Sequence, residues 1–218
     1  MILIGITDIH GNADAVDAIA APLKDADVVC VAGDITHYGR TAETERVVEA
    51  ISRHAGSILA VFGNCDYPEV EAYLVKRQIN LHATARTVDG LGFLGLGGSL
   101  ATPFNTPLEY TEPELARFLE QAKSDISDGL PMVMVSHQPP FNTACDRLGS
   151  GDHVGSREVY RFIEQYQPLV CFTGHIHEAF GTDRIGETWV VNPGQLGHGR
   201  YAYAEIEDGR VQVEIRTF

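Results

Sequence analysis

Five apolar stretches of this chain each end in a short polar motif rich in aspartate, asparagine or histidine. The motifs are Asp8-Ile9-His10-Gly11-Asn12, Gly33-Asp34, Gly63-Asn64-Cys65-Asp66, Ser136-His137 and Gly174-His175-Ile176-His177. Short apolar runs that end in such turns and alternate with amphipathic segments are typical of βαβ units with a buried, largely parallel sheet. Because ligands of such sheets gather at the carboxyl ends of the strands, we expect the motifs to meet there.

The first half of the chain alternates between strand-like and helix-like segments. Strands are predicted over residues 1–7, 27–32 and 57–62, and helices over residues 13–24, 41–54 and 67–77. Towards its end the chain changes to alternating strands, predicted over residues 179–184, 187–191, 199–206 and 210–217, with a hairpin at Asp208-Gly209. An α/β region therefore passes into a mostly antiparallel one.

The middle of the chain contains short β-like pieces that glycines interrupt between Thr84 and Thr102. A helix is predicted to start at Thr111, because this capping residue is followed by a proline in the first turn and by Glu114 three residues on. The remaining elements are a strand over 131–135, a glycine-rich loop over 138–155, a helix capped by Ser156 and a strand over 169–173. Loops of that length in a compact domain are usually functional or mobile.

Length and composition predict an ordinary globular protein. The 218 residues suffice for one domain, residues 1–218, that buries about 70% of the surface of the unfolded chain. No apolar stretch approaches the roughly 18 residues of a membrane span, and the apolar start runs directly into Asp8 without a basic leader, so we expect a core strand rather than a signal peptide. Four cysteines without a Cys-x-x-Cys spacing favour reduced thiols and a cytoplasmic location, with disulfides as the alternative.

The net charge of −14, with 16 Lys and Arg residues against 30 Asp and Glu residues, argues against a broad nucleic-acid or anionic-membrane face. Such surfaces are normally bound by clustered lysine and arginine side chains. Two bound dications would nevertheless add about four positive charges at one point, where a single phosphate group could bind.

Among their residues the motifs offer two aspartates, Asp8 and Asp34, one asparagine, Asn64, and four histidines as candidate ligands, which is the set that a pair of divalent metal ions needs. Asp8 and His10 lie two residues apart just beyond a strand, so their side chains can converge on one point. Imidazole nitrogen combined with carboxylate and amide oxygen suits Mn, Fe, Zn, Co or Ni better than Ca or Mg. A carboxylate that bridges two ions holds them about 3.5–4 Å apart, and a shared hydroxide can then attack phosphorus in line.

In this order along the chain, from Asp8 to about Gly194, the motifs resemble those of the calcineurin-like metallophosphoesterases. The resemblance implies an α/β fold of two mixed β-sheets packed face to face with helices outside, a four-layer sandwich. It implies two divalent metal ions, Mn, Zn, Fe or Ni. It assigns the ligands as follows: Asp8, His10 and His177 to one ion, Asn64, His137 and His175 to the other, with Asp34 bridging. We expect Asp34, Asn64 and His137 to be catalytic.

The sequence departs from the commoner family pattern at Cys65, where many members carry a histidine thought to help the leaving group depart. A neutral thiol with a pKa near about 8.5 is a poor substitute for an imidazolium acid. The Gly-Asn-Cys-Asp form resembles a branch associated with phosphodiester hydrolysis. We therefore predict a metal-dependent phosphodiesterase that uses a metal-bridging hydroxide on a small phosphate ester. A phosphomonoesterase or nucleotide pyrophosphatase on the same metals, or a catalytically silent scaffold, are the alternatives.

Several other residues are candidates for supporting roles. Asn12 and Asp66 are predicted to orient metal ligands, because metal-bound histidines and carboxylates usually need such partners. His153, in the long loop after His137, is a candidate for contact with the substrate or the leaving group, and His37 faces either the site or solvent. Neither a stable nucleic-acid complex nor a membrane is expected, and the sequence leaves the oligomeric state open.

Overall fold

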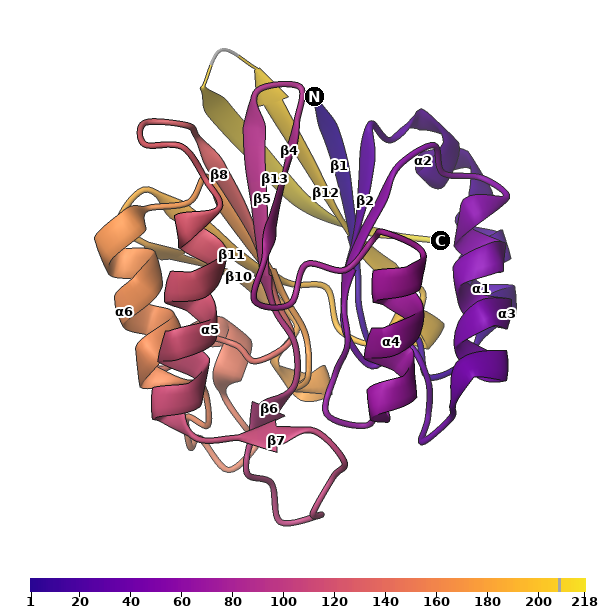
Figure 1. Ribbon diagram of the computed structural model, residues 1–218, viewed down its shortest axis with the longest axis horizontal. Coiled ribbons are helices and arrows are strands. Elements are labelled where there is room, and N and C mark those ends of the chain that lie inside the picture. Colours follow the sequence, from indigo (N-terminus) through magenta and orange to yellow (C-terminus); the bar gives the residue numbers. More distant parts are fainter. Residues whose placement is uncertain (208) are drawn as a thin grey trace.

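The chain folds into two large mixed β-sheets that pack face to face, with helices on both outer sides (Figure 1). The computed structural model describes residues 1–207 and 209–218. In spatial order, the first sheet consists of β13 (Arg210–Thr217), β12 (Arg200–Glu207), β1 (Ile2–Ile6), β2 (Val28–Ala32) and β3 (Ile58–Val61). The second consists of β10 (Gly181–Ile185), β11 (Thr188–Asn192), β9 (Val170–Thr173), β8 (Met132–Ser136), β5 (Leu91–Leu96) and β4 (Ala85–Val88). The predicted four-layer α/β sandwich is confirmed.

The helices form the two outer layers. Those that cover the first sheet are α1 (Ala13–Ala18), α2 (Ala20–Asp25), α3 (Thr41–Ser52) and α4 (Pro68–Lys76). Those that cover the second sheet are α5 (Glu112–Ser124) and α6 (Arg157–Tyr166), on the opposite side of the molecule in Figure 1. A short parallel pair, β6 (Ser99–Leu100) and β7 (Glu109–Tyr110), flanks a loop that reaches the site described below.

The apolar runs in the sequence are strands that are buried on both faces. In β2, Val29 and Val31 pack against the helices, whereas Val28, Cys30 and Ala32 pack between the two sheets. Successive strand side chains point to opposite faces, so a strand at the centre of this sandwich needs apolar residues at every position. The core strands β1, β2 and β3 are mutually parallel, as are β5, β8, β9 and β11.

Two details differ from the sequence-based expectation. The helix predicted over residues 13–24 is broken at Ile19, because Pro22 has no backbone N–H to donate to Ala18 and its ring crowds that carbonyl. Strand β11 pairs antiparallel with β10 but parallel with β9, so the end of the chain is less uniformly antiparallel than expected. The predicted hairpin at Asp208-Gly209 includes Asp208, which lies outside the described residues, and β12 and β13 pair antiparallel on either side of it.

Over residues 1–207 and 209–218, no helix is long and apolar enough to cross a bilayer.

His82 couples the stability of the fold to pH. Its ring is buried against Phe62 and Phe118, with centroid distances of 4.7 and 4.6 Å, and its Nδ1 accepts a hydrogen bond from the backbone N–H of Gly97. Burial lowers the pKa of His82 to about 4. The pKa of a histidine in an unfolded chain is about 6.5. Between pH 4 and pH 6.5, His82 therefore binds a proton in the unfolded chain but not in the folded one. The stability present above pH 6.5 is therefore lost as the pH falls towards 4.

We expect His82→Asn to flatten this pH dependence, because an asparagine oxygen can accept the hydrogen bond from Gly97 without titrating. The wild type should lose about 3 kcal/mol more than the variant between about pH 7 and pH 4. Urea unfolding across this range measures the difference. The control Phe162→Leu, in the core around α6, should lower stability equally at every pH. Equal slopes for the wild type and His82→Asn would contradict the assignment.

Candidate metal centre

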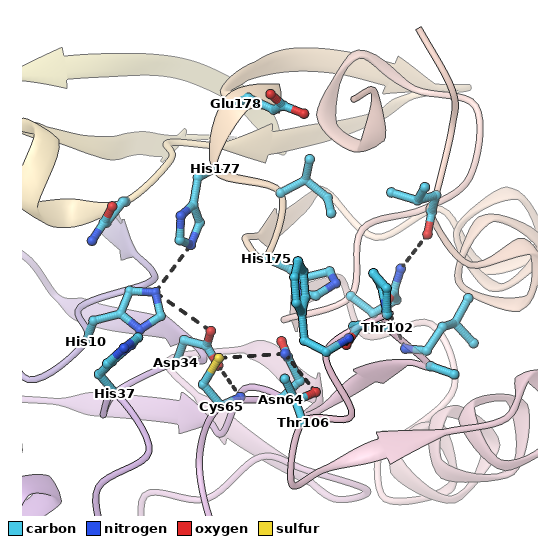
Figure 2. A pocket seen from close by; sticks show the side chains of 18 of the residues that line it. His10, Asp34, His37, Asn64, Cys65, Thr102, Thr106, His175, His177 and Glu178 are labelled. Atoms are coloured by element: carbon cyan, nitrogen blue, oxygen red, sulfur yellow. Dashed lines mark hydrogen bonds and ion pairs between the residues drawn. The ribbon is translucent and has the colours of Figure 1, made fainter. Parts of the chain in front are cut away.

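The five motifs meet at the carboxyl ends of strands from both sheets. The first sheet delivers Asp8 after β1, Asp34 after β2 and Asn64 after β3. The second delivers His137 after β8, and His175 and His177 after β9. Figure 2 shows the side chains of His10, Asp34, Asn64, His175 and His177 around a common centre. The structure thus brings together all seven residues that the sequence singles out as metal ligands.

Four of these residues have a backbone conformation that is unusual for side chains larger than glycine. The φ angles of Asp8, His10, Asp34 and His175 are 52°, 48°, 47° and 69°. A non-glycine residue in this left-handed region costs about 1–2 kcal/mol, and such residues cluster at functional sites. The backbone N–H groups of Asp8 and His10 donate to the carbonyls of Gly33 and Asp34, at 3.1 and 2.9 Å, so the turns after β1 and β2 hold each other in place.

Glycines of the motifs are required where polar side chains of the site approach the backbone closely. A Cβ on Gly33 would collide with the His137 ring, and a Cβ on Gly63 would collide with the Asp34 carboxylate. Three of the motifs, those with Gly33, Gly63 and Gly174, therefore place a glycine directly before the polar residue, because a side chain there would occupy the space in which the polar groups meet.

The first group of ligand atoms belongs to Asp8, His10 and His177. Asp8 Oδ1 lies 3.1 Å from His177 Nε2, and the Nε2 atoms of His10 and His177 are 3.3 Å apart. Asp8 Oδ2 accepts hydrogen bonds from the Thr7 hydroxyl and the backbone N–H of His175. Asp8 Oδ1, however, is buried and has no hydrogen-bond partner within residues 1–207 and 209–218. A buried carboxylate oxygen without a donor, next to two imidazole nitrogens, fits the coordination of a cation.

The second group belongs to Asn64, His137 and His175. His137 Nδ1 lies 2.8 Å from the carbonyl oxygen of Ala32 and donates to it, which leaves the lone pair on Nε2. That Nε2 lies 2.8 Å from Asn64 Oδ1, because the Asn64 amide nitrogen donates to the Thr106 hydroxyl. With Nδ1 as the donor, the neutral ring turns its Nε2 lone pair towards the Asn64 oxygen, which is also an acceptor. The His175 ring centroid lies 5.1 Å from that of His137. This geometry again fits a cation.

The protonation of two of these histidines, His10 and His175, agrees with this interpretation. Burial lowers the pKa of His10 to about 4 and that of His175 to about 3. Both rings are therefore neutral near pH 7 and present lone pairs, which is the form in which imidazole binds metals.

Asp34 lies between the two groups. Its Oδ2 lies 3.8 Å from His10 Nε2, and its Oδ1 lies 3.5 Å from His137 Nε2. Oδ1 also accepts a hydrogen bond from the backbone N–H of Cys65. Burial raises the pKa of Asp34 to about 7, so ionising this carboxylate is costly in the absence of a nearby positive charge. A metal ion on either side would reverse that cost.

Asp66 links the loops that carry Asp34 and Asn64. The buried Asp66 carboxylate accepts hydrogen bonds from the backbone N–H groups of Ile35, Thr36 and Gly63 and from the Thr36 hydroxyl, at 2.7–3.1 Å. Asn12, the other predicted supporting residue, caps helix α1 by accepting a hydrogen bond from the backbone N–H of Ala15. The supporting roles predicted for Asp66 and Asn12 stay predictions.

We expect Asp66→Asn to weaken metal binding as well as stability. An amide that replaces this carboxylate turns an N–H₂ group towards backbone donors, and each buried donor left without a partner costs about 1–3 kcal/mol. Displacing Asp34 and Asn64 together should lower metal affinity by about 10–100-fold. Titration of the purified variant with Mn²⁺ measures this affinity.

Asp146 offers a matched control for that substitution. It is an equally buried carboxylate that accepts hydrogen bonds from Asn142, Thr143, Gly155 and His153 in the loop after β8. Asp146→Asn should lower stability to a similar degree and leave the Mn²⁺ affinity unchanged. Wild-type affinity in Asp66→Asn would show that Asp66 does not organise the ligands.

The remaining candidates differ in their position. Cys65 lines the pocket in front of the ligands, with its Sγ 3.7 Å from the Asn64 amide nitrogen, and burial raises the pKa of its thiol. His37 is exposed on the pocket wall, with its ring edge-on to His10 at 5.3 Å. The His153 imidazole points to Asp146, with Nδ1 2.6 Å from its Oδ1, and the pocket lining among the described residues does not include it.

Sequence reasoning missed several residues that shape the site. Thr7 fixes the Asp8 carboxylate and Thr106 fixes the Asn64 amide. Thr7 could have been suspected from its position next to Asp8, whereas Thr106 lies in a loop 42 residues beyond Asn64 and carries no signal in the sequence.

The chain belongs to the calcineurin-like phosphoesterase superfamily, because residues 1–209 match the model of that superfamily's domain. It is 39% identical to the uncharacterized protein MJ1162 of Methanocaldococcus jannaschii over 198 residues, which cover 88% of each chain. It is 25% identical to the UPF0046 protein K07C11.7 of Caenorhabditis elegans over 197 residues, which cover 81% of this chain and 65% of that protein.

Solved structures with the same fold include TT1561 of Thermus thermophilus, with a TM-score of 0.73 and 21% identity, covering 98% of this chain and 97% of that one. They also include a dimetal phosphatase from Danio rerio, with a TM-score of 0.63 and 12% identity, covering 100% and 96%. The resemblance seen in the sequence motifs is therefore confirmed. The protein is a member of a metal-dependent phosphoesterase family, and its cluster of aspartates and histidines can hold metal.

Proposed function

We propose that this protein is a dinuclear metal-dependent phosphodiesterase. Asp8, His10 and His177 would hold one ion, Asn64, His137 and His175 the other, and Asp34 would bridge them. The position of Asp34 carries the proposal, because its two oxygens face two separate groups of ligand atoms, towards His10 and towards His137. A scaffold that had lost its activity would have no reason to keep a strained and buried arrangement of this kind.

The chemistry follows from the groups that the chain provides. Two bound ions would supply an activated water and neutralise the charge on the phosphoryl oxygens. The protein orients two of their ligands through the hydrogen bonds that His137 donates to the carbonyl of Ala32 and that Asn64 donates to the hydroxyl of Thr106. Cys65 is the nearest thiol, and its raised pKa keeps it protonated and a poor nucleophile. We therefore expect direct attack by water on phosphorus, without a covalent phosphoenzyme.

The preference for diesters rests on the same cysteine. A half-buried thiol with a raised pKa donates a proton poorly to a departing alkoxide, so substrates with good leaving groups should react best. Phosphomonoesterase and nucleotide pyrophosphatase activities on the same metals remain the competing activities.

A reconstitution experiment tests the proposal. Protein stripped by a chelator should be inactive, and reloading with Mn, Zn, Fe or Ni should restore hydrolysis of bis(4-nitrophenyl) phosphate in preference to 4-nitrophenyl phosphate. Turnover that survives removal of all metal, or a clear preference for the monoester, would refute it.

A further inference from the structure

The pocket in front of the candidate metal centre has a largely apolar wall. It has a volume of about 890 Å³, and beyond the candidate metal ligands it is lined by side chains from several loops. Its apolar members are Leu100, Ala101, Pro103, Phe104, Leu148, Val154 and Ile176. Phe104 is 78% exposed, the highest value among the exposed large hydrophobic residues of the described chain. A ligand that covers this exposed ring removes apolar surface from water, and this burial favours binding.

The same wall carries no fixed positive charge. None of the described residues that line the pocket is a lysine or an arginine, and Glu178 adds a carboxylate at its rim. Positive charge at the site would therefore come from the metal ions alone, which suffices for one phosphoryl group. A second phosphate on the substrate would lie beside Glu178 without a cationic partner, in a protein of net charge −14.

The apolar wall is held in place by partly buried polar contacts. Gln138, which directly follows His137, accepts a hydrogen bond from the backbone N–H of Leu100 and donates one to the carbonyl of Val154, so it joins two sides of the wall. Glu109 accepts hydrogen bonds from Thr102 and Thr106, which flank Phe104. Thr106 in turn holds Asn64. The wall and the candidate metal ligands are therefore parts of one hydrogen-bonded framework.

We propose that the substrate is a phosphodiester whose second ester group is uncharged and apolar, an alkyl chain or an aromatic ring. This group lies against Phe104, Leu148 and Val154 while the phosphoryl group faces the candidate metal ligands. The inference rests on the proposed phosphodiesterase function and narrows its substrate class. It excludes nucleotide polyphosphates and nucleic acids as preferred substrates. Their additional phosphates would lie against an apolar wall that offers no lysine or arginine to pair with them.

A series of alkyl 4-nitrophenyl phosphates tests the proposal, since the leaving group stays the same while the alkyl ester grows from methyl to hexyl. We expect kcat/KM to rise by about two- to fourfold for each methylene that the wall covers. A hexyl analogue that ends in a carboxylate should lose most of this gain. A flat series, or a preference for the carboxylate ester, would overturn the proposal.

Two variants locate the effect. Phe104→Ser, at an exposed position where folding is not at risk, should reduce the slope of log kcat/KM against chain length. Val75→Ser, at a similarly exposed apolar residue on α4 outside the pocket, should keep the wild-type slope. If the methyl ester is hydrolysed with metal but the slope is flat, only the substrate class is wrong. If no diester of the series is hydrolysed with any metal, the proposed function itself fails.

Discussion

Replacing Asp34 by asparagine should reduce diester hydrolysis by about 10³-fold or more and lower the metal content at both sites. Asp34 faces His10 through one oxygen and His137 through the other, so loss of one carboxylate affects both groups of ligands. An amide offers a single neutral oxygen, which cannot bridge two cations as a carboxylate does. Elemental analysis of metal per chain, together with the rate on bis(4-nitrophenyl) phosphate, measures both effects.

Two comparisons separate this effect from simple unfolding. Burial raises the pKa of Asp34 to about 7, so in metal-free protein its ionised form destabilises the fold as the pH rises above the unfolded value. Metal-free Asp34→Asn should therefore be at least as stable as metal-free wild type at about pH 8. Asn12→Ala, which removes the cap of α1, should cost only about 10–100-fold in rate. A variant at Asp34 that retains two ions and wild-type turnover would refute the bridging role.

Replacing Cys65 by histidine should raise the hydrolysis of alkyl monoesters by about 10²-fold and flatten the dependence of rate on leaving-group pKa. The Cys65 side chain lines the pocket, and the backbone N–H of Cys65 donates a hydrogen bond to Asp34. A side chain at this position therefore lies next to the candidate metal ligands. An imidazolium there can protonate the departing oxygen, which the thiol with its raised pKa does poorly. Rates for a series of aryl and alkyl esters with leaving groups of known pKa measure the change.

The matched control is Cys65→Ser, which offers no better acid and should keep the steep dependence of the wild type. If wild type already hydrolyses alkyl monoesters as well as aryl diesters, another residue is the acid and the diesterase assignment loses its basis. His37 would then be tested first, because it lies on the pocket wall, whereas His153 is hydrogen-bonded to Asp146.

Much of the fold could be predicted because its central strands are buried on both faces. A run such as Val28–Ala32 has to be apolar at every position, so the continuous run itself indicates a strand although apolar and polar residues do not alternate. The break at Ile19 was missed because the apolar pattern continues across it, although Pro22 marks it. The pairing of β11 with β9 depends on contacts between distant segments that no local pattern encodes.

The sequence shows which types of metal-binding residue are present, but it does not show which of them lie together in space. His10 and His177 are 167 positions apart, and only the family resemblance suggests that they meet. The contacts of Thr106 with Asn64, and of Gln138 with two sides of the wall, depend on loop geometry. The apolar wall was missed because Phe104 and Leu148 lie in loops, where neither helical nor strand periodicity marks a buried or ligand-facing position.

The most direct test of the dinuclear site is a titration of metal-free wild-type protein with Mn²⁺ while bound metal and diester turnover are followed together. The two groups of ligand atoms on either side of Asp34 predict that activity rises to a plateau at two ions per chain. A plateau at one ion per chain, or turnover that does not depend on the metal added, would contradict a dinuclear phosphodiesterase.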